Sequence, residues 1–414
     1  MKFLRAGIYA LIVFAVVAHG GVEDWAKAVL ETGAGLLLLV WAARTLLRRE
    51  TTLQLPVALP PLILFAIFVF VQWKFHLTVY GYATRVDLQL LLAYLIVIFL
   101  AGQAFETTQD WKGCIWFVMS LGFAVSIFGI LQHLTFNGKL YWFREMRYGG
   151  IPFGPYVNRN HFAGLVELVI PAGLVPLALG RVRRERWPIA GLFTLIPIGA
   201  LFLSASRGGI VSFLWELALL AMLLLLRRSG AKHALAGGVI LLLALALVSW
   251  LGVRQALERF ASLQPLEVTH AKRISMARDT RRIFLDYPVA GTGLGTLQSV
   301  YPKYETLYDG KIVNHAHNDY LEALAETGLL GGACCAWFLV LLIWRGLKRV
   351  LNPENTFAGA LQTAGLVGCL GFLAHSAVDF NLHIPSNVLL FLLFSLLATV
   401  EMQRSAAHVP SRNS

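Results

Sequence analysis

The chain has 414 residues, of which 57% are hydrophobic and only 14% are charged, and its mean hydropathy is +0.66. These values exclude a soluble fold of this length and indicate an integral membrane protein. The formal net charge is +12. Because the basic residues lie in loops between apolar runs, this excess does not indicate a nucleic-acid partner.

Apolar runs of roughly 17–25 residues, the length that crosses a bilayer as a helix, recur along the whole chain. They predict an all-α, polytopic membrane protein with about twelve transmembrane helices in a single membrane domain over residues 1–414. The first run could pass for a signal peptide, but no small-residue cleavage pattern follows it, which predicts a retained helix. The predicted cores are 4–20, 27–46, 57–73, 88–104, 113–134, 161–180, 188–204, 208–226, 234–252, 319–345, 358–377 and 386–402.

The four cysteines fall in or at the edge of apolar spans, and none lies in the largest polar segment. They are Cys114, Cys334, Cys335 and Cys369. This distribution indicates no disulfide framework, and the spacing contains no CxxC metal pattern.

Lys and Arg in the short loops predict the orientation of the helices, because cytoplasmic loops carry an excess of both. If the spans simply alternate, four basic clusters fall on one side, which is then the cytoplasm and holds both termini. The clusters follow the second, sixth, eighth and tenth predicted spans: Arg44, Arg48 and Arg49; Arg181, Arg183, Arg184 and Arg186; Arg227, Arg228 and Lys232; Arg345, Lys348 and Arg349.

Four polar segments collect on the opposite, outer side and predict one site built from several loops. They are residues 135–161, the hairpin 204–209, the long loop 253–318 between the ninth and tenth predicted spans, and residues 375–383. The first segment carries four cations, against the charge rule for short outer loops: Lys139, Arg144, Arg147 and Arg159. We interpret this exception as a sign of an anionic ligand; the alternative is a basic loop without one.

The long loop is expected to be partly helical. Residues 257–262 and 271–285 have apolar residues spaced three and four apart, which is typical of helices. Arg278 and Arg282 share one stripe of the second helix, whereas Arg273 points about 140° away from Arg278 and is expected to face inward. The glycine-rich run 291–295 is interpreted as a tight turn, because no strand precedes it as in a phosphate loop.

The stretch Asn314–Gly332 ends this loop and runs straight into an apolar helix. It therefore places His315, His317, Asn318 and Asp319 where water meets the membrane. A titratable pair at such a boundary can exchange protons and still sit beside a lipid-bound substrate. The alternative is an interfacial helix cap, since Asn and Asp are favoured capping residues.

Four segments, taken together, resemble a known family. They are Asn158-Arg-Asn-His161; Ser204-Ala-Ser-Arg207-Gly; Arg273 with Pro288 and Gly291-Thr-Gly-Leu-Gly295; and His315-Ala-His-Asn-Asp-Tyr-Leu-Glu322 with Glu326-Thr-Gly-Leu-Leu-Gly331. Their order and common side resemble the O-antigen ligase and Wzy-type polymerase superfamily of bacterial envelope glycosyltransferases, over residues 120 to 400.

The resemblance implies a GT-C-like helical membrane fold in the bacterial inner membrane, with its active site facing the periplasm. It implies that an undecaprenyl-diphosphate-linked glycan is transferred, with inversion and without a metal or cofactor, to a hydroxyl of a glycan or lipid-linked acceptor. The implied partners are these substrates, membrane lipids and a chain-length regulator. By motif position, Arg207 and Arg273 correspond to the diphosphate-binding arginines, and His317 to the essential loop histidine.

The residue types suit this chemistry. Forked arginine donors can stabilise a leaving diphosphate without a metal. The acceptor hydroxyl needs a base near neutral pH, for which His317 is the candidate and His315 its partner or the true base. The predicted site comprises the catalytic residues His317 and His315, the diphosphate-binding residues Arg207, Arg273 and Arg159, and the supporting residues Asn158, Asn318, Asp319, Glu322 and Asp379.

Three functions are compatible with these patterns: a polymerase of lipid-linked repeat units, a ligase that moves the glycan to lipid A-core or another acceptor, and a transporter. The segment 379–383 looks more like the polymerase and exopolysaccharide branch, which favours the first. Glu167 and Glu216 lie within predicted spans and would suit a transporter. A transporter, however, usually places its polar motifs near the midplane, whereas these gather at one face.

Overall fold

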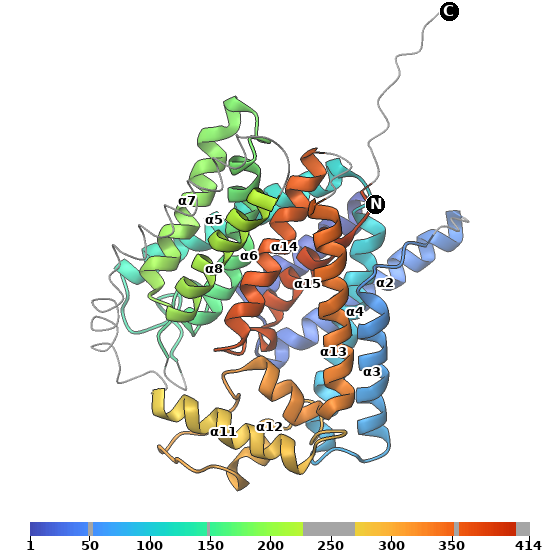
Figure 1. Ribbon diagram of the computed structural model, residues 1–414, viewed down its shortest axis with the longest axis vertical. Coiled ribbons are helices and arrows are strands. Elements are labelled where there is room, and N and C mark those ends of the chain that lie inside the picture. The colour runs from blue at the N-terminus through green and yellow to red at the C-terminus, as the bar shows by residue number, and fades with distance from the viewer. Residues whose placement is uncertain (49–52, 147–149, 227–269, 352–355, 403–414) are drawn as a thin grey trace, which may run out of the picture.

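A computed structural model of the protein describes residues 1–48, 53–146, 150–226, 270–351 and 356–402. Within these residues the regular structure is helical, with two isolated β-bridges and no strand. The predicted all-helical class is therefore confirmed. Figure 1 shows long helices packed into one bundle, with the two helices α11 and α12 lying at one end of it.

Eleven of the predicted spans coincide with helices of the structure. These are α1 Lys2–Val17, α2 Asp24–Arg48, α3 Leu59–Lys74, α4 Gly81–Ala104, α5 Thr108–Leu134, α6 Arg159–Ala178, α7 Trp187–Ser204, α8 Arg207–Leu226, α13 Asp319–Leu351, α14 Thr356–Ser376 and α15 Pro385–Thr399. Eight helices in the described ranges are long and apolar enough to cross a bilayer, and α3 and α15 are shorter apolar helices. The ninth predicted span, 234–252, and the predicted helix 257–262 lie outside the described residues, so the count of twelve stays a prediction.

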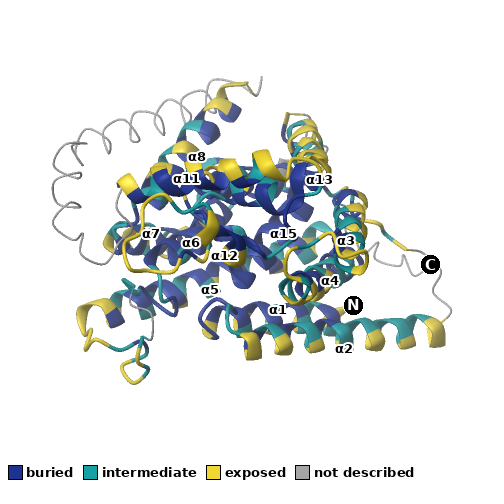
Figure 2. Cartoon of the chain, turned by 90° about the horizontal axis from the view of Figure 1, so that it is seen from below, coloured by how far each residue is buried: buried dark blue, intermediate teal, exposed yellow. Residues whose placement is uncertain are grey.

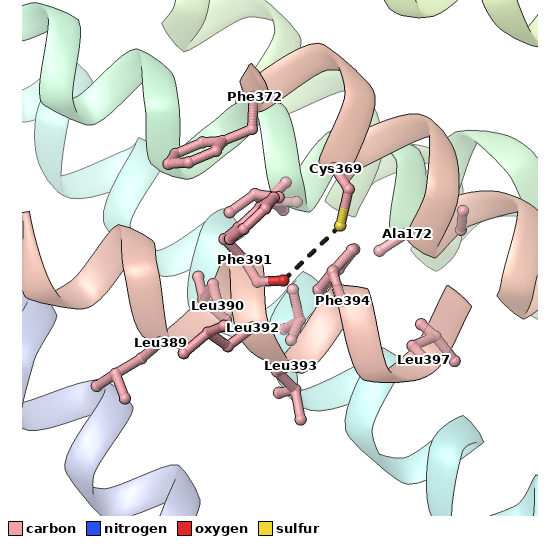
Figure 3. Packing of buried hydrophobic residues seen from close by; sticks show 14 of the residues in the cluster. Ala172, Cys369, Phe372, Leu389, Leu390, Phe391, Leu392, Leu393, Phe394 and Leu397 are labelled. Atoms are coloured by element: carbon pink, nitrogen blue, oxygen red, sulfur yellow. Dashed lines mark hydrogen bonds between the residues drawn. The ribbon is translucent and has the colours of Figure 1, made fainter. Parts of the chain in front are cut away.

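The centre of the bundle is formed by α6, α14 and α15. Every residue of α15 is buried, and Figure 2 shows this buried interior surrounded by helices with exposed outer faces. Where α14 meets α15, the ring of Phe372 stacks on that of Phe391 at 5.2 Å, and Cys369 Sγ lies 3.7 Å from the carbonyl oxygen of Phe391 (Figure 3). Because α6 here meets two consecutive helices from much later in the chain, its start and the turn between α14 and α15 bring distant segments together.

The loops of the bundle gather at two opposite ends. At the end covered by α11 and α12, the amide of Val79 donates to Thr292 O at 2.8 Å and that of Ser386 donates to Gly20 O at 2.9 Å. At the other end, Arg349 pairs with Glu401. The described members of the basic clusters lie at this second end. The alternation of all twelve spans stays a prediction, because the ninth predicted span lies outside the described residues.

The described part of the long loop, residues 270–318, is folded, as expected from its apolar spacing. It contains α11 His270–Asp286, the short α12 Leu297–Val300 and the 3-10 turn η2 Tyr301–Lys303. Met276 and Ile283 of α11, Leu297 and Val300 of α12 and Ala325 of α13 share a small buried core. This core attaches the loop to the start of α13.

A glycine-rich turn fixes the loop against a kink in α13. Gly291 has φ +71°, and a Cβ there would lie 2.2 Å from the backbone carbon of Glu326; Gly328 has φ +60° and interrupts the helical geometry of α13. The amides of Gly295 and Leu297 each donate to the Glu326 carboxylate at 2.8 Å. The interpretation of the run 291–295 as a tight turn is confirmed, and the acceptor of its amides is a carboxylate of the protein itself.

The two-ended arrangement predicts labelling from opposite sides of the membrane. In a variant whose four cysteines are replaced by Ala, Tyr308→Cys, at a side chain that is 74% exposed in the outer loop, should react with an impermeant maleimide in intact spheroplasts. Glu185→Cys, in the exposed turn before α7, should react only after permeabilisation. Labelling of both residues from the same side would contradict the alternation.

Candidate active site

A cavity of about 870 Å³ opens among the loops at the α11 end and continues between the helices. Its polar end is lined by residues from four separate segments: His161, Arg273, His315, His317 and His383. Its apolar part is lined by side chains of α3, α4, α13 and α15: Leu62, Phe65, Leu91, Leu95, Cys335, Leu339 and Leu392. The cavity therefore joins titratable groups to an environment that suits hydrocarbon.

The first imidazole–carboxylate pair of the site is His317 with Asp379. His317 Nδ1 lies 3.2 Å from Asp379 Oδ1, and the side chains are 14% and 1% exposed. The other oxygen, Asp379 Oδ2, accepts from Asn160 Nδ2 at 2.6 Å, and Ser206 donates to Asn160 Oδ1 at 2.9 Å. The first turn of α6 and the segments that precede α8, α13 and α15 are thereby connected by one hydrogen-bonded chain.

The second group contains His315, Glu322, His383 and Asp319. His315 Nδ1 lies 2.8 Å from Glu322 Oε1, and His383 Nε2 lies 3.3 Å from the same oxygen. His383 Nδ1 lies 3.0 Å from Asp319 Oδ1. Both ring nitrogens of His383 therefore face carboxylate oxygens, an arrangement that favours the doubly protonated imidazolium.

The carboxylates and the ring charges shift one another's pKa values in opposite directions. Burial by itself would raise the pKa of Asp379, but the hydrogen bond and charge of His317, with His161 and His375 nearby, hold it well below its ordinary range. Burial by itself would lower the pKa of His383, but the Glu322 carboxylate and the Asp319 hydrogen bond outweigh it and raise the pKa to about 10. Asp379 is therefore ionised and His383 is cationic at neutral pH.

The ring of Phe380 lies between the two groups. It stacks on His315 with ring centroids 4.5 Å apart and meets His317 and His161 edge-on, each at 4.8 Å. The preceding residue is Asp379, whose Oδ1 accepts from the amide of Phe380 at 2.9 Å. One aromatic side chain thus fixes the planes of three imidazoles that come from two further segments.

Of the three predicted diphosphate-binding arginines, only Arg273 lines the cavity. Its Nη1 donates to Val378 O at 3.4 Å, while Arg278 and Arg282 are exposed, so Arg273 faces inward as expected. Arg207 begins α8 directly after Ser206, beside the hydrogen-bonded chain but outside the cavity lining. Arg159 is 3% exposed at the start of α6, and it is also outside the lining.

The outer-side cations do not gather around one site. Lys139 Nζ lies 3.3 Å from Glu145 Oε1, and Arg144 pairs with Glu23. Both cations have carboxylate partners and neither lines the cavity. The interpretation that they mark an anionic ligand stays a prediction. Arg147 lies outside the described residues.

The two predicted asparagines cap helices. Asn158 Oδ1 accepts from the amide of Asn160 at 2.9 Å and starts α6. Asn318 Oδ1 accepts from the amide of Leu321 at 3.0 Å and starts α13, while its Nδ2 donates to Ala377 O at 2.9 Å. The capping interpretation of the Asn314–Gly332 stretch therefore holds for Asn318, whereas His315 and His317 pair with carboxylates.

The cluster of His315, Glu322 and His383 has a composition that could hold a metal ion. The three ligand atoms lie within 4.8 Å of one another, which is compatible with a zinc-like donor set. The same atoms are already paired with each other, and the second nitrogen of His383 faces Asp319. Mutual hydrogen bonding and ion pairing therefore account for this arrangement, and metal independence stays a prediction.

Four residues of the site were not predicted: Asn160, His161, Phe380 and His383. All four lie in segments that carried a sequence signal, 158–161 and 379–383. The signal that was missing is their mutual contact, which exists only after α6, α14 and α15 have packed.

The geometry defines a polytopic helical membrane protein with imidazole–carboxylate pairs and a guanidinium at the polar end of a cavity between its helices. Residues 190–336 match a family model described as O-antigen ligase. This match confirms the resemblance to the O-antigen ligase and Wzy superfamily that the motifs carry. No curated protein matches the chain.

The matched segment runs from α7 into α13. It contains Arg207, Arg273, His315 and His317, while Asp379 and His383 follow it. The family implies a glycosyltransferase-type ligase or polymerase activity on lipid-linked glycans in a membrane. It does not by itself distinguish a ligase from a polymerase.

The raised pKa of His383 predicts how stability depends on pH. The stabilisation from this imidazolium should be complete below pH about 6.5, the ordinary histidine value, and should be lost as the pH rises through the folded-state value of about 10. The melting temperature of the wild type should therefore fall between pH 7 and 10 by more than that of His383→Gln. His133→Gln, at an exposed histidine near the end of α5, is the matched control and should follow the wild type. Parallel curves for wild type and His383→Gln would contradict the assignment.

Proposed function

We propose that the protein polymerises undecaprenyl-diphosphate-linked oligosaccharide repeat units at the periplasmic face of the bacterial inner membrane. The observation that carries this proposal is the cavity that joins the His317–Asp379 pair and Arg273 to an apolar wall between α3, α4 and α13. A lipid diphosphate has the same division between a charged head group and a hydrocarbon chain. One cavity can therefore accept both parts of the donor.

The reaction we propose is a single displacement. The Nε2 atom of neutral His317 takes the proton of the acceptor hydroxyl, whose oxygen attacks the anomeric carbon of the donor sugar as the bond to the diphosphate breaks. Attack opposite the leaving group inverts that carbon. Asp379, ionised and held by Asn160, stabilises the imidazolium that forms.

Arg273 is proposed to bind the leaving diphosphate. Negative charge grows on the diphosphate as the glycosidic bond breaks, and a planar guanidinium offers paired donors to its oxygens. Arg207 begins α8 directly after Ser206. We propose that it binds the same diphosphate from the side of the hydrogen-bonded chain. These two cations would supply the charge that a metal ion supplies in other transferases.

Polymerisation is favoured over ligation by the segment 379–383. Asp379, Phe380 and His383 all belong to the site, and this segment carries the resemblance to the polymerase and exopolysaccharide branch. A ligase that acts on lipid A-core is the second candidate, because the matching family model is described as O-antigen ligase. The two activities differ in whether a second kind of acceptor is needed.

The test is transfer by the purified protein in liposomes. With a lipid-diphosphate-linked repeat unit as the only glycan, a polymerase should produce a ladder of longer lipid-linked chains. Products that form only after a lipid A-core acceptor is added would indicate the ligase instead. Absence of transfer with either acceptor would contradict the proposal.

In the same assay, His317→Ala should abolish single-turnover transfer and leave donor binding intact, because Arg273 still holds the diphosphate. His315→Ala should be less severe, since its contacts are to Glu322 and Phe380 and not to Asp379. Donor binding can be followed through protection of Cys335, a thiol that lines the apolar part of the cavity, from a thiol reagent. An inactive His315→Ala beside an active His317→Ala would assign the base to His315.

Arg273→Lys should reduce transfer by at least about tenfold, because one ammonium group cannot replace a planar, forked donor. Arg278→Lys is the matched control on the same helix; that side chain is exposed and the change should have little effect. The comparison is made on initial rates at equal amounts of folded protein. If Arg273→Lys transfers at a rate close to that of Arg278→Lys, Arg273 does not bind the diphosphate.

A further inference from the structure

A titratable pair lies inside the bundle, apart from the cavity. Glu167 of α6 and His375 of α14 are 0% and 1% exposed, and Glu167 Oε1 lies 2.8 Å from His375 Nδ1. Neither residue lines the cavity. Ionisable groups inside a membrane protein are costly to bury, so their presence between two apolar helices calls for a function.

The first turn of α8 rests on both members of the pair. A Cβ atom at Gly208 would lie 2.4 Å from His375 Nε2, and one at Gly209 would lie 3.2 Å from Glu167 Oε1. The two glycines therefore let α8 approach the pair closely. Since Arg207 directly precedes them, its position depends on where the pair holds this turn.

The pair is also connected to the site through the backbone and through α6. His375 O accepts from the amides of Val378 at 2.9 Å and Asp379 at 3.1 Å, so the turn that carries Asp379 begins on His375. Asn160, which donates to Asp379, lies seven residues before Glu167, about two turns along α6. The pair is thus carried by α6 and α14 and contacted by α8, and the ends of all three helices reach the hydrogen-bonded chain.

We propose that Glu167 and His375 are positioning residues for the transfer reaction: they lock α6, α8 and α14 in the one arrangement that places Asp379 and Arg207 at the site. This inference rests on the proposed function. An apolar pair of similar size would pack as well, but a polar pair whose nitrogen and oxygen lie 2.8 Å apart fixes the rotation and register of the helices that carry it. Both side chains act through other residues and touch no substrate.

A matched control is available in the same part of the bundle. Glu216 of α8 is 1% exposed and faces Gly371 of α14, where a Cβ atom would lie 2.0 Å from Glu216 Oε1. It lies nine residues along α8 from Arg207, about two and a half turns from the site. Glu216→Gln therefore removes a buried carboxylate between α8 and α14 while both members of the Glu167–His375 pair are kept.

The experiment compares Glu167→Gln, His375→Gln, the exchange Glu167→His with His375→Glu, and the control Glu216→Gln. Each is purified, its melting temperature is measured, and single-turnover transfer is expressed per folded molecule. Both single variants should lose at least about tenfold in rate, since a displacement of about 1 Å can cost roughly 100-fold. The exchange should recover most of that rate, and Glu216→Gln should keep the wild-type rate.

Single variants that melt at a lower temperature but transfer at the wild-type rate would overturn the proposal, and so would an exchange that folds without recovering activity. If the exchange does not fold, Gly208→Ala decides: its added methyl group must displace His375, so transfer should slow while the pair is chemically intact. A wild-type rate for Gly208→Ala would then count against positioning by the pair.

The failure of the proposed function can be told apart from the failure of this inference. If the wild type itself transfers no lipid-linked glycan, the proposed function fails. The pair is then judged by hydrogen exchange of the amides in the segment 377–384. Glu167→Gln should speed exchange there relative to Glu216→Gln, and equal rates would overturn the positioning role.

Discussion

The architecture of the site depends on one buried carboxylate, Asp379. Its two oxygens face His317 from the loop before α13 and Asn160 from the first turn of α6, and its side chain is 1% exposed. A carboxylate that is not compensated would be very costly at this depth. The four loops at this end must therefore pack in the arrangement that supplies its partners, which couples the fold of the bundle to the geometry of the site.

The spans and the location of the site follow from the sequence because their cause is local. The bilayer requires each crossing segment to satisfy its own backbone hydrogen bonds, so length and hydropathy predict helices almost without regard to tertiary contacts. The same applies to α11, whose apolar spacing places Arg273 inward. Asn318 lies next to the helix that it caps, and the sequence indicates that role as well.

The contacts between segments could not be predicted in this way. Glu326 accepts from the amides of Gly295 and Leu297. In a phosphate loop such amides would bind a phosphate, and nothing in either segment alone indicates that a carboxylate of the protein binds them here. Arg159 has the residue type that suits a diphosphate, yet packing buries it away from the cavity. Phe380 was read as part of a motif, whereas its role depends on three imidazoles that reach it from elsewhere. In each case the missing information is tertiary.

The partners of His315, His317 and His383 separate their roles. His383 has carboxylates at both nitrogens and is a fixed cation, so it is unable to accept a proton. Glu322 shares one oxygen between His315 and His383 and therefore already compensates one positive charge. Asp379 directs one oxygen to His317 and receives only a neutral amide at the other. A new positive charge is thus stabilised best on His317, and this asymmetry is the physical reason for assigning the base to it rather than to its neighbour two residues away.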